Sequence, residues 1–429
     1  MRIAIPKERR AGELRVAASP ETVKKLVQLG CEVAVEKGAG AGAALADDAY
    51  KDVGATIAMD AASAIKGAQM VLKVRSPEAA ERKHLAKDQV LIAILDPLRA
   101  TADVKALAKA GVQSFAMDLM PRITRAQSMD VLSSQANLAG YKAVLDAAAE
   151  FGRAFPLMMT AAGKIAPAQV LVMGAGVAGL QAIATARRLG GVVHATDVRP
   201  AAKEQVESLG GKFVAVEDEE FKQAETAGGY AKEMSDAYKK KQAELTASTI
   251  AKMDIVITTA LIPGRPAPKL IDEAMVKSMR QGSVIVDLAV ETGGNCALSQ
   301  AGKVVTKHGV KILGHENMPS RLATDTSQLY ARNVLNFAQL MIDKESKALS
   351  IDLEDEIIKG TLVTQGGKIV HPMLASVEAD KEEAEEAPKK APAKKAPAKK
   401  KAAPAKSEEP KPEAGESDQA DKSDKESEA

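Results

Sequence analysis

The chain has 429 residues, a formal net charge of +2 and an apolar content of 46%. This length exceeds that of a usual single domain and the apolar content supports sizeable cores, so we expect two domains and a cytosolic type of composition. The near-neutral charge gives no indication of nucleic-acid binding, and the sequence shows neither a secretory signal nor an apolar run of the roughly 18 residues that a membrane span needs.

The first 130 residues alternate strand-like and helix-like segments. We predict strands at Arg2–Ile5, Glu32–Val35, Met70–Val74 and Val90–Ile94, and helices at Pro20–Leu29 and Thr101–Ala110. Alternation of this kind is typical of a parallel α/β sheet.

A polar segment follows, from Pro121 to Asn137, and concentrates arginine, glutamine, aspartate and serine at the expected domain junction. In two-domain α/β proteins that junction forms the cleft in which ligands lie. Amide, hydroxyl and guanidinium groups could orient a nicotinamide ring there by hydrogen bonding. On spacing alone, a solvated connector explains the segment equally well.

The strongest motif runs from Val170 to Asp197, and its parts follow one another in the order that a dinucleotide fold needs. After an apolar strand, Gly174 permits a tight turn, Gly176 lets the backbone approach a pyrophosphate, and Gly179 allows close packing of the next helix. That helix directs its partial positive end at the phosphates. Together with the second strand and the acid that follow, the turn predicts dinucleotide binding.

Asp197 indicates which dinucleotide is bound. It ends the second strand about 20 residues after the glycines, where a carboxylate accepts hydrogen bonds from the adenosine ribose. An acid at this position repels the extra phosphate of NADP, so NAD is favoured. Arg199 is a competing signal, because an arginine could pair with that phosphate; we give the acid more weight.

The dinucleotide unit continues to about residue 318. We predict further strands at Lys212–Val216, Asp254–Ala260, Ser283–Ala289 and Lys303–Thr306. Between the first two of these strands lies a long polar insertion, Glu217 to Lys252, which we interpret as a functional or mobile loop. A helix from Thr324 is expected to return to the N-terminal domain.

After Val377 the composition changes to lysine, alanine, proline and glutamate. Such a segment has almost no apolar side chains to bury, so we expect residues 378–429 to be a disordered tail. A basic run there could contact acidic surfaces or nucleic acid, but the acidic second half from Ser407 offsets its charge, and a simple tether is the favoured interpretation.

Four motifs together resemble one family. They are Pro121–Ser133, Gly174–Gly179, Asp197-Val-Arg-Pro200 and Gly228-Gly-Tyr-Ala-Lys-Glu-Met234. The chain resembles, over about residues 1 to 375, the NAD(H)-binding subunit of the proton-translocating nicotinamide nucleotide transhydrogenases. The resemblance implies that Arg122, Gln127, Asp130 and Ser133 hold the nicotinamide and its ribose, and that Tyr230 lies on a loop that closes over the nucleotide.

The same resemblance supplies the complete set of expected site residues and no metal site. The residues expected to orient the nicotinamide are Arg122, Gln127, Asp130 and Ser133, and those expected to bind NAD(H) are Arg122, Arg125, Gln127, Asp130, Ser133, Gly174, Gly176, Val177, Gly179, Asp197, Val198, Arg199, Gly229, Tyr230, Thr259, Ala260 and Leu261. Cys31 and Cys296 have no metal-binding spacing and are read as ordinary thiols.

Alanine dehydrogenase belongs to the wider family and is the alternative function. Arg15 and Lys73 match positions that grip a keto acid there, although each could instead be an ordinary surface ion-pair partner. Leu95-Asp96-Pro97 stands where the dehydrogenase has its catalytic histidine, and Glu291 aligns with its aspartate. Without a histidine the reaction lacks its acid and base. The five histidines are read as surface or loop residues, and Arg15 and Lys73 as structural.

We therefore predict an α/β fold with two Rossmann-like domains, whose parallel sheets are separated by a cleft, and a disordered C-terminal tail. The N-terminal domain comprises residues 1–132 and 319–377, and the NAD(H)-binding domain residues 133–318. The expected activity is hydride transfer from NADH to NADP⁺ held by a partner subunit, coupled to proton translocation by membrane-spanning subunits. The resemblance further implies a homodimer, without nucleic acid or direct membrane insertion, in the cytoplasm at the inner membrane. A non-enzymatic NAD sensor is a more distant alternative.

Overall fold

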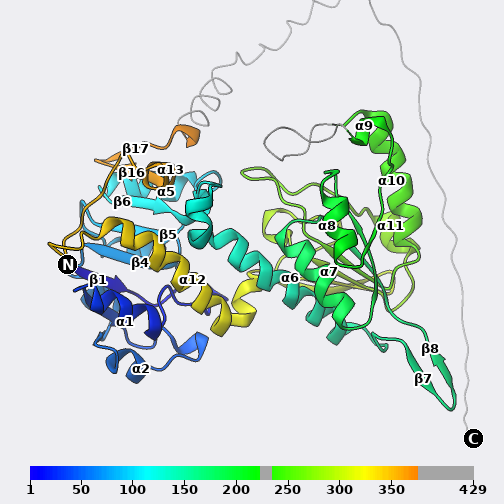
Figure 1. The fold of residues 1–429 in the computed structure, drawn as a ribbon, viewed down its shortest axis with the longest axis horizontal. Coiled ribbons are helices and arrows are strands. Elements are labelled where there is room, and N and C mark those ends of the chain that lie inside the picture. Colours follow the sequence, from blue (N-terminus) through cyan, green and yellow to red (C-terminus); the bar gives the residue numbers. More distant parts are fainter. Residues whose placement is uncertain (223–233, 375–429) are drawn as a thin grey trace, which may run out of the picture. The chain divides into compact units, whose positions relative to one another are not determined.

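Two large sheets organise the protein in the computed structural model, which describes residues 1–222 and 234–374 (Figure 1). The first sheet has eight strands in the order β17-β16-β6-β5-β4-β1-β2-β3, and the second has seven in the order β11-β10-β9-β12-β13-β15-β14. Strand pairing is parallel except at β16 and β17 of the first sheet and β14 of the second. The predicted α/β fold with two Rossmann-like sheets is confirmed, while the expected tail lies outside the described residues.

The elements around the first sheet come from both ends of the described chain. Its strands are β1 (Arg2–Ile5), β2 (Glu32–Glu36), β3 (Thr56–Ala58), β4 (Met70–Arg75), β5 (Val90–Ile94), β6 (Gln113–Ala116), β16 (Leu362–Gln365) and β17 (Lys368–Ile369). Its helices are α1 (Pro20–Gln28), α2 (Asp47–Lys51), α3 (Ala61–Ile65), α4 (Ala79–Arg82), α5 (Thr101–Lys109), α12 (Ala323–Ala338) and α13 (Glu356–Thr361).

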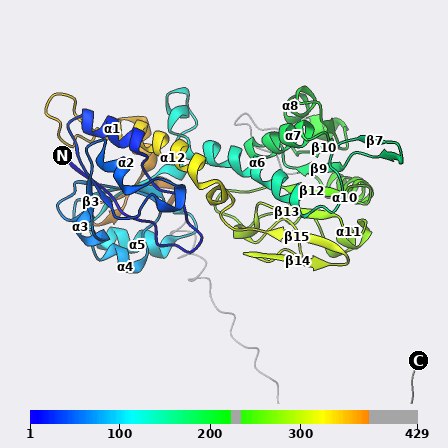
Figure 2. The same cartoon turned by 90° about the horizontal axis from the view of Figure 1, so that it is seen from below.

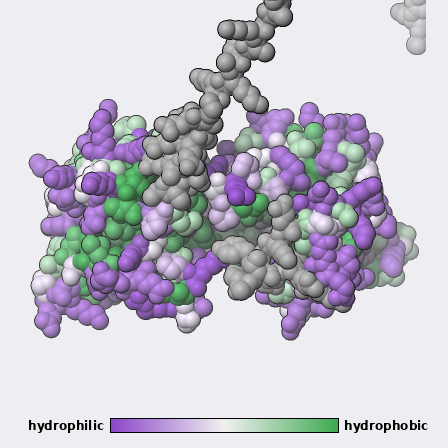
Figure 3. Space-filling model, turned by 90° about the horizontal axis from the view of Figure 1, so that it is seen from above, coloured by the Kyte–Doolittle hydropathy of each residue, from purple (hydrophilic) through white to green (hydrophobic). Residues whose placement is uncertain are grey.

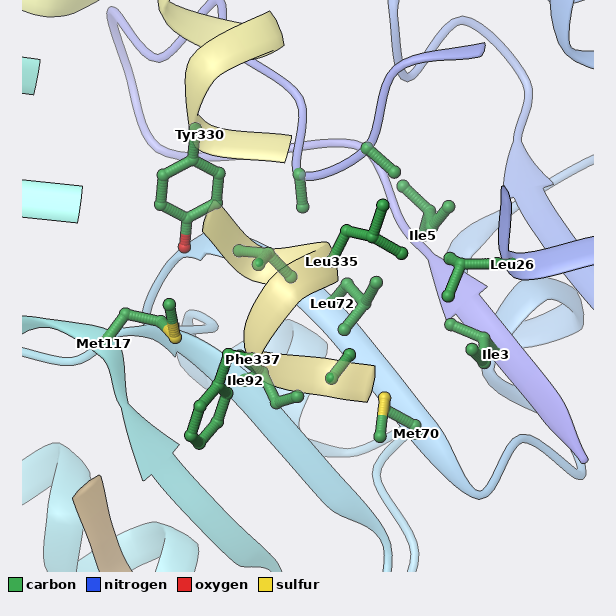
Figure 4. Close-up of a cluster of buried hydrophobic side chains, with 14 of the residues drawn as sticks. Ile3, Ile5, Leu26, Met70, Leu72, Ile92, Met117, Tyr330, Leu335 and Phe337 are labelled. Carbon is green, nitrogen blue, oxygen red and sulfur yellow. The ribbon is translucent and has the colours of Figure 1, made fainter. Parts of the chain in front are cut away.

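Helix α12 supplies much of the core on one face of this sheet. Its side chains Tyr330 and Phe337 are fully buried, and Figure 4 shows them beside Leu72 of β4 and Ile92 of β5. Helices α3 and α5 pack against the opposite face. Because both faces are covered, the central strands are apolar on both sides, as parallel strands in α/β proteins usually are.

The second sheet is formed from the middle of the chain. Its strands are β9 (Gln169–Met173), β10 (Val192–Thr196), β11 (Lys212–Phe213), β12 (Ile255–Thr258), β13 (Val284–Asp287), β14 (Lys303–Lys307) and β15 (Val310–Gly314). The associated helices are α6 (Val131–Glu150), α7 (Val177–Arg188), α8 (Ala202–Ser208), α9 (Glu219–Lys222), α10 (Asp236–Ile250) and α11 (Glu273–Ser278). Short 3₁₀ turns are η1 (Ala41–Ala43), η2 (Met117–Leu119), η3 (Thr124–Met129), η4 (Val290–Thr292), η5 (Met318–Leu322) and η6 (Gln339–Met341).

Helices α6 and α7 pack on one face of the second sheet, and α10 and α11 contribute to the core on the other (Figure 2). The contact between α6 and α7 is unusually close. A Cβ atom at Gly140 of α6 would lie 2.0 Å from the carbonyl oxygen of Ala178 in α7, so a glycine is required there. The N-terminal part of α6 is thereby held beside the first turn of α7.

A two-stranded hairpin, β7 (Met158–Thr160) and β8 (Gly163–Ile165), pairs with neither large sheet. It projects away from the second sheet in both ribbon views (Figures 1 and 2). Leu157, Met158, Met159 and Ile165 are exposed there. An isolated hairpin is at best marginally stable in water, so burial of these apolar side chains against another surface would stabilise it.

Hydrophilic residues cover most of the face drawn in Figure 3, and hydrophobic residues form patches between them. Over residues 1–222 and 234–374, no helix combines the length and the apolar character needed to cross a membrane.

The interpretation of Glu217 to Lys252 as one long loop was wrong for most of its described part. Helix α9 begins within it and α10 occupies fifteen of its residues. Ser235 caps α10 by accepting a hydrogen bond from the backbone of Tyr238, and the helix has no clear apolar face. A helix that is polar nearly all round gives no periodic signal, which is why the sequence pattern missed it.

Two further expectations need correction. Ser133 lies within helix α6 rather than in a loop, because Asp130 starts that helix as its N-cap. Of the five histidines, His194 is a half-buried residue of strand β10, and His371 is buried, with its Nε2 atom 3.2 Å from the Gly360 carbonyl oxygen. Burial lowers the pKa of both imidazoles.

Candidate functional site

The glycine turn between β9 and α7 divides its three glycines into two kinds. Gly174 has a left-handed φ of +103°, and a Cβ atom at Gly179 would lie 1.8 Å from the Gly174 carbonyl oxygen. These two are required by the turn itself. A Cβ atom at Gly176 would meet nothing within 4 Å, so the backbone there faces open space. Gly176 is also the N-cap of α7 and provides no side chain to cap it.

This arrangement fits the phosphates of a dinucleotide. The first turn of a helix carries backbone N–H groups without intrahelical partners and a partial positive charge, both of which attract an anion. Val177, the first residue of α7, is exposed at the same position. The expected residues Gly174, Gly176, Val177 and Gly179 are thus brought together as the sequence suggested.

Asp197 follows β10 and is fastened to the glycine turn. One of its oxygens accepts a hydrogen bond from the Ala175 backbone at 2.7 Å, and the other accepts from the backbone and Nε of Arg199, both at 2.9 Å. Arg199 therefore pairs with the acid, whereas the sequence had suggested it as a rival determinant of nucleotide choice. Val198, between them, is exposed.

The end of β12 forms the neighbouring wall. The hydroxyl of Thr259 donates to the Gly174 carbonyl oxygen at 3.0 Å, which joins this strand end directly to the glycine turn. Ala260 follows, and Leu261 is 56% exposed. The carboxyl ends of β9, β10 and β12 thus meet at the edge of a parallel sheet where such folds bind ligands.

The junction segment approaches the same region through α6. Asp130 accepts hydrogen bonds from both the backbone and the hydroxyl of Ser133. Near the start of the same helix, Asn137 lies 3.4 Å from Gln181 of α7 in a side-chain hydrogen bond. Gln127 and Arg122 are exposed. Helix α6 therefore links the predicted nicotinamide residues to the glycine turn.

Arg125 is used differently from the expectation. Its guanidinium forms two hydrogen bonds, of 2.7 and 2.8 Å, with the carboxylate of Asp355, which in turn caps α13. This exposed bidentate pair explains Arg125 without a nucleotide. Gly229 and Tyr230, the remaining expected residues, lie outside the described residues.

Arg15 and Lys73 are deeply buried, so the alternative of ordinary surface ion pairs was wrong. Arg15 is 2% exposed and binds Glu13 through two hydrogen bonds of 2.8 and 2.7 Å. Lys73 is 1% exposed, and its Nζ atom lies 2.7 Å from Glu81 and 3.3 Å from Glu8. We call these five residues the buried charge cluster.

Partners within the protein saturate this cluster. Burial by itself would raise the pKa of Glu13, but the hydrogen bonds and charge of Arg15 outweigh burial and lower that pKa to about 2. Burial raises the pKa of Glu8. The remaining Arg15 donors reach Gln135 at 2.7 Å and Asn317 at 3.1 Å. Little donor capacity is left for a bound carboxylate.

A polar cavity of about 220 Å³ lies beside the cluster, where a dehydrogenase would need a histidine. Its lining includes Arg75, Asp96, Arg99, Glu291 and Glu316, and no histidine. Asp96 has a left-handed φ of +48° and its backbone N–H donates to buried Asp118 at 2.8 Å. The cavity contains charge pairs without a group that could exchange a proton near neutral pH.

A larger cavity, of about 450 Å³, lies at the opposite edge of the second sheet and is lined by residues such as Arg153, Gln169 and Asp254. Gln169 and Asp254 mark the amino ends of β9 and β12, away from the glycine turn. Volume alone therefore points to the wrong edge, and the strand geometry is the better guide.

Sequence reasoning missed two fully buried residues near the site. Asp287 ends β13, and its carboxylate accepts hydrogen bonds from Thr258, Ala289, Cys296 and Ser299. Asn295 binds the backbone of Ala260 on both sides. A polar residue at a strand end and another after two glycines were the available signals, but neither motif names its partner.

Comparison with known proteins matches both halves of the chain to family models. Residues 4–139 match the model described as the alanine dehydrogenase/PNT N-terminal domain, and residues 143–372 match the alanine dehydrogenase/PNT C-terminal domain. The chain is 62% identical over 379 residues to the first of the polypeptides that make up the NAD(P) transhydrogenase alpha subunit of Rhodospirillum rubrum. The match covers 87% of this chain and 99% of that relative.

Two solved structures are also similar. The transhydrogenase from Sinorhizobium meliloti superimposes with a TM-score of 0.79 at 54% identity, covering 86% of this chain and all of the other. An L-alanine dehydrogenase superimposes with a TM-score of 0.74 at 28% identity, covering 89% of this chain and 99% of the other. The fold is shared with both, and the sequence is considerably closer to the transhydrogenases.

Proposed function

The chain belongs to the alanine dehydrogenase/PNT family and functions as a NAD(P) transhydrogenase alpha subunit, and from this premise we propose that it holds NADH for hydride transfer to NADP⁺ on a partner subunit. The glycine turn carries the proposal, since Gly176 leaves open space beside the N-terminus of α7 and Asp197 is fastened next to it. We further propose that residues 133–318 form the nucleotide domain and that residues 1–132 and 319–377 form the other.

The proposed roles follow from which groups remain available to a ligand. Backbone N–H groups around Gly176 hold the pyrophosphate, and Asp197 accepts the adenosine ribose hydroxyls once Arg199 yields. The expected set around Gln127, which includes Arg122, Asp130 and Ser133, orients the nicotinamide and its ribose by hydrogen bonds. NADH supplies the hydride, so the protein has to orient and shield the ring rather than provide an acid or base.

Partner subunits complete the proposed activity. No more than one glycine turn of this type occurs in the described residues, so NADP(H) is assigned to a second polypeptide that docks near Gln127. Membrane-spanning subunits couple the transfer to proton movement and hold the chain at the cytoplasmic side of the inner membrane. The proposed homodimer is supported by the hairpin β7–β8, whose exposed Met158, Met159 and Ile165 offer an apolar surface to a second copy.

Alanine dehydrogenase remains the second candidate only through the shared fold. The residues that would bind its keto acid, Arg15 and Lys73, are occupied by internal carboxylates. The direct test compares NADH oxidation by the isolated chain, given pyruvate and ammonium, with hydride transfer to NADP⁺ after the partner subunits are added. We expect only the second reaction. Reductive amination at a substantial rate would overturn the proposed function.

Gln127 provides a test within the site. Gln127→Asn keeps the amide but moves it by one methylene, so NADH affinity should stay within about tenfold, or about 1.4 kcal/mol, while hydride transfer slows far more. Equal losses in the dissociation constant and in the transfer rate would remove the orienting role from this residue.

A further inference from the structure

We propose that Asn295 is a positioning residue for the nucleotide, and that the loop to which it belongs links the nucleotide site to the first sheet. We call residues 287–299, which begin at the last residue of β13, the clamp loop. The inference rests on the proposed binding of NADH at the glycine turn and assigns a new role to residues outside that turn.

Asn295 holds the wall of the site through its side-chain amide. It is fully buried, and its Oδ1 atom accepts from the Ala260 N–H at 3.1 Å. Its Nδ2 atom donates to the carbonyl oxygens of Ala260 at 2.9 Å and Pro268 at 2.8 Å. Both polar groups of the Ala260 backbone are therefore fixed by one side chain, in the segment that carries exposed Leu261.

The residues just before Ala260 are fixed as well. Thr258 donates its hydroxyl to buried Asp287 at 3.2 Å, and Thr259 donates to the carbonyl oxygen of Gly174. Three consecutive residues are thus held by three separate side-chain hydrogen-bonding arrangements, two of which come from the clamp loop. Moving Ala260 would change the wall that faces the glycine turn, so Asn295 sets the shape of the nucleotide site without touching the nucleotide.

The opposite end of the clamp loop is bound to residues of the first sheet and its connections. Glu291 lies 3.3 Å from the guanidinium of Arg75, and its backbone carbonyl oxygen accepts from Arg99 at 2.9 Å. Arg75 ends β4 and Arg99 precedes α5. The other carboxylate oxygen of Glu291 accepts from the Asn317 backbone at 2.7 Å.

Between Glu291 and Asn295 the loop has little freedom. Gly293 and Gly294 have left-handed φ values of +99° and +77°, and a Cβ atom at Gly294 would lie 2.7 Å from the carboxylate of Asp287. A short connection whose two ends are both held by hydrogen bonds transmits a displacement from one to the other. The affinity for NADH should therefore respond to the ion pair between Glu291 and Arg75.

The first experiment separates positioning from ordinary stabilisation. Gln89 is the matched control, since it is also a buried amide, 4% exposed, that makes three backbone hydrogen bonds, to Ala86, Ile65 and Ala68. Asn295→Ala should raise the NADH dissociation constant of the full chain about tenfold or more, measured by NADH fluorescence. Gln89→Ala should lower the melting temperature similarly and leave that constant within about twofold.

The second experiment tests transmission and does not depend on a buried substitution. Glu291→Gln changes a partly exposed side chain, so the variant should fold, and it should raise the NADH dissociation constant about threefold. Glu316→Gln, which alters a carboxylate of the same cavity outside the clamp loop, is its control and should have no effect. Combined with Asn295→Ala, Glu291→Gln should add less than its own threefold, because Ala260 has already been released.

The outcomes distinguish the inference from the function on which it rests. Wild-type chain that fails to bind NADH would overturn both. Wild-type binding together with an unchanged dissociation constant in Asn295→Ala, or with equal losses in Asn295→Ala and Gln89→Ala, would overturn the positioning role. Equal effects of Glu291→Gln and Glu316→Gln, or fully multiplicative effects in the double variant, would overturn the transmission through the clamp loop.

Discussion

The buried charge cluster and the glycine turn are both polar, but their groups differ in what they have left to bind. In the cluster, Arg15 and Lys73 are surrounded by the carboxylates of Glu8, Glu13 and Glu81. At the turn, the backbone around Gly176 faces open space. Polar side chains inside a protein are therefore evidence for a ligand only when their own partners leave donors or acceptors unused.

Lys73→Met gives the largest expected effect in this comparison. It leaves Glu8 and Glu81 buried without their cation, and breaking a buried ion pair in this way costs about 3 to 5 kcal/mol. Denaturant unfolding should show this loss while the NADH dissociation constant stays within about twofold. Lys51→Met, at an exposed lysine paired with Asp48, should leave stability unchanged. A loss of NADH affinity in folded Lys73→Met would join the two regions that we separate.

Acid should weaken the cluster through Glu13. Its pKa is about 2 in the folded chain against 4.5 ordinarily, so its stabilising contribution is complete above about pH 4.5 and disappears as the pH falls toward 2. The full contribution corresponds to about 3 kcal/mol. The free energy of unfolding of wild type should therefore exceed that of Glu13→Gln at pH 6, and the difference should shrink on acidification. A difference that does not change with pH would contradict this assignment.

Asp197→Ala tests the open region. The substitution removes the acceptor for the adenosine ribose and frees Arg199 to meet a phosphate, so NADH affinity should fall about tenfold or more, or by at least about 1.4 kcal/mol. Discrimination against NADPH should decrease at the same time. Titrations of the isolated chain with both nucleotides measure the two effects. An unchanged preference would make Arg199 the next candidate for selectivity.

Arg125→Gln has the smallest expected effect on binding. Because the guanidinium is held by Asp355 on the protein surface, NADH affinity should change by less than about twofold. Asp355→Asn breaks the same pair from the other side and should behave alike. If only the arginine variant lost affinity, Arg125 would return to the nucleotide site, where the family resemblance had put it.

The sequence predicted the fold well where its signals are local. The order of strand, glycine turn, helix and acid from Val170 to Asp197 follows from neighbouring residues, and the structure has these elements within one or a few residues of the predicted bounds. Strands β16 and β17 were not predicted, because each is too short to show an alternating pattern.

The partners of polar residues could not be predicted in the same way. Arg15 is bound by Asn317, which is 302 residues away, and Arg125 is bound by Asp355, which is 230 residues away. No periodicity or motif spans such distances. The same limit applies to Asn295, whose partner Ala260 precedes it by 35 residues. Motifs therefore indicated where a nucleotide would bind, while the side chains that shape the site became visible only in three dimensions.

The return of α12 to the first sheet has a consequence for how the protein is made. During synthesis the strands of the second sheet are complete once β15 has emerged from the ribosome, whereas strands β1 to β6 still lack Tyr330 and Phe337 of α12 and the added strand β16. The segment translated first is thus the last that can finish its core. Nascent chains that stall before α12 would expose an unfinished apolar face, which makes this sheet the natural target for chaperones.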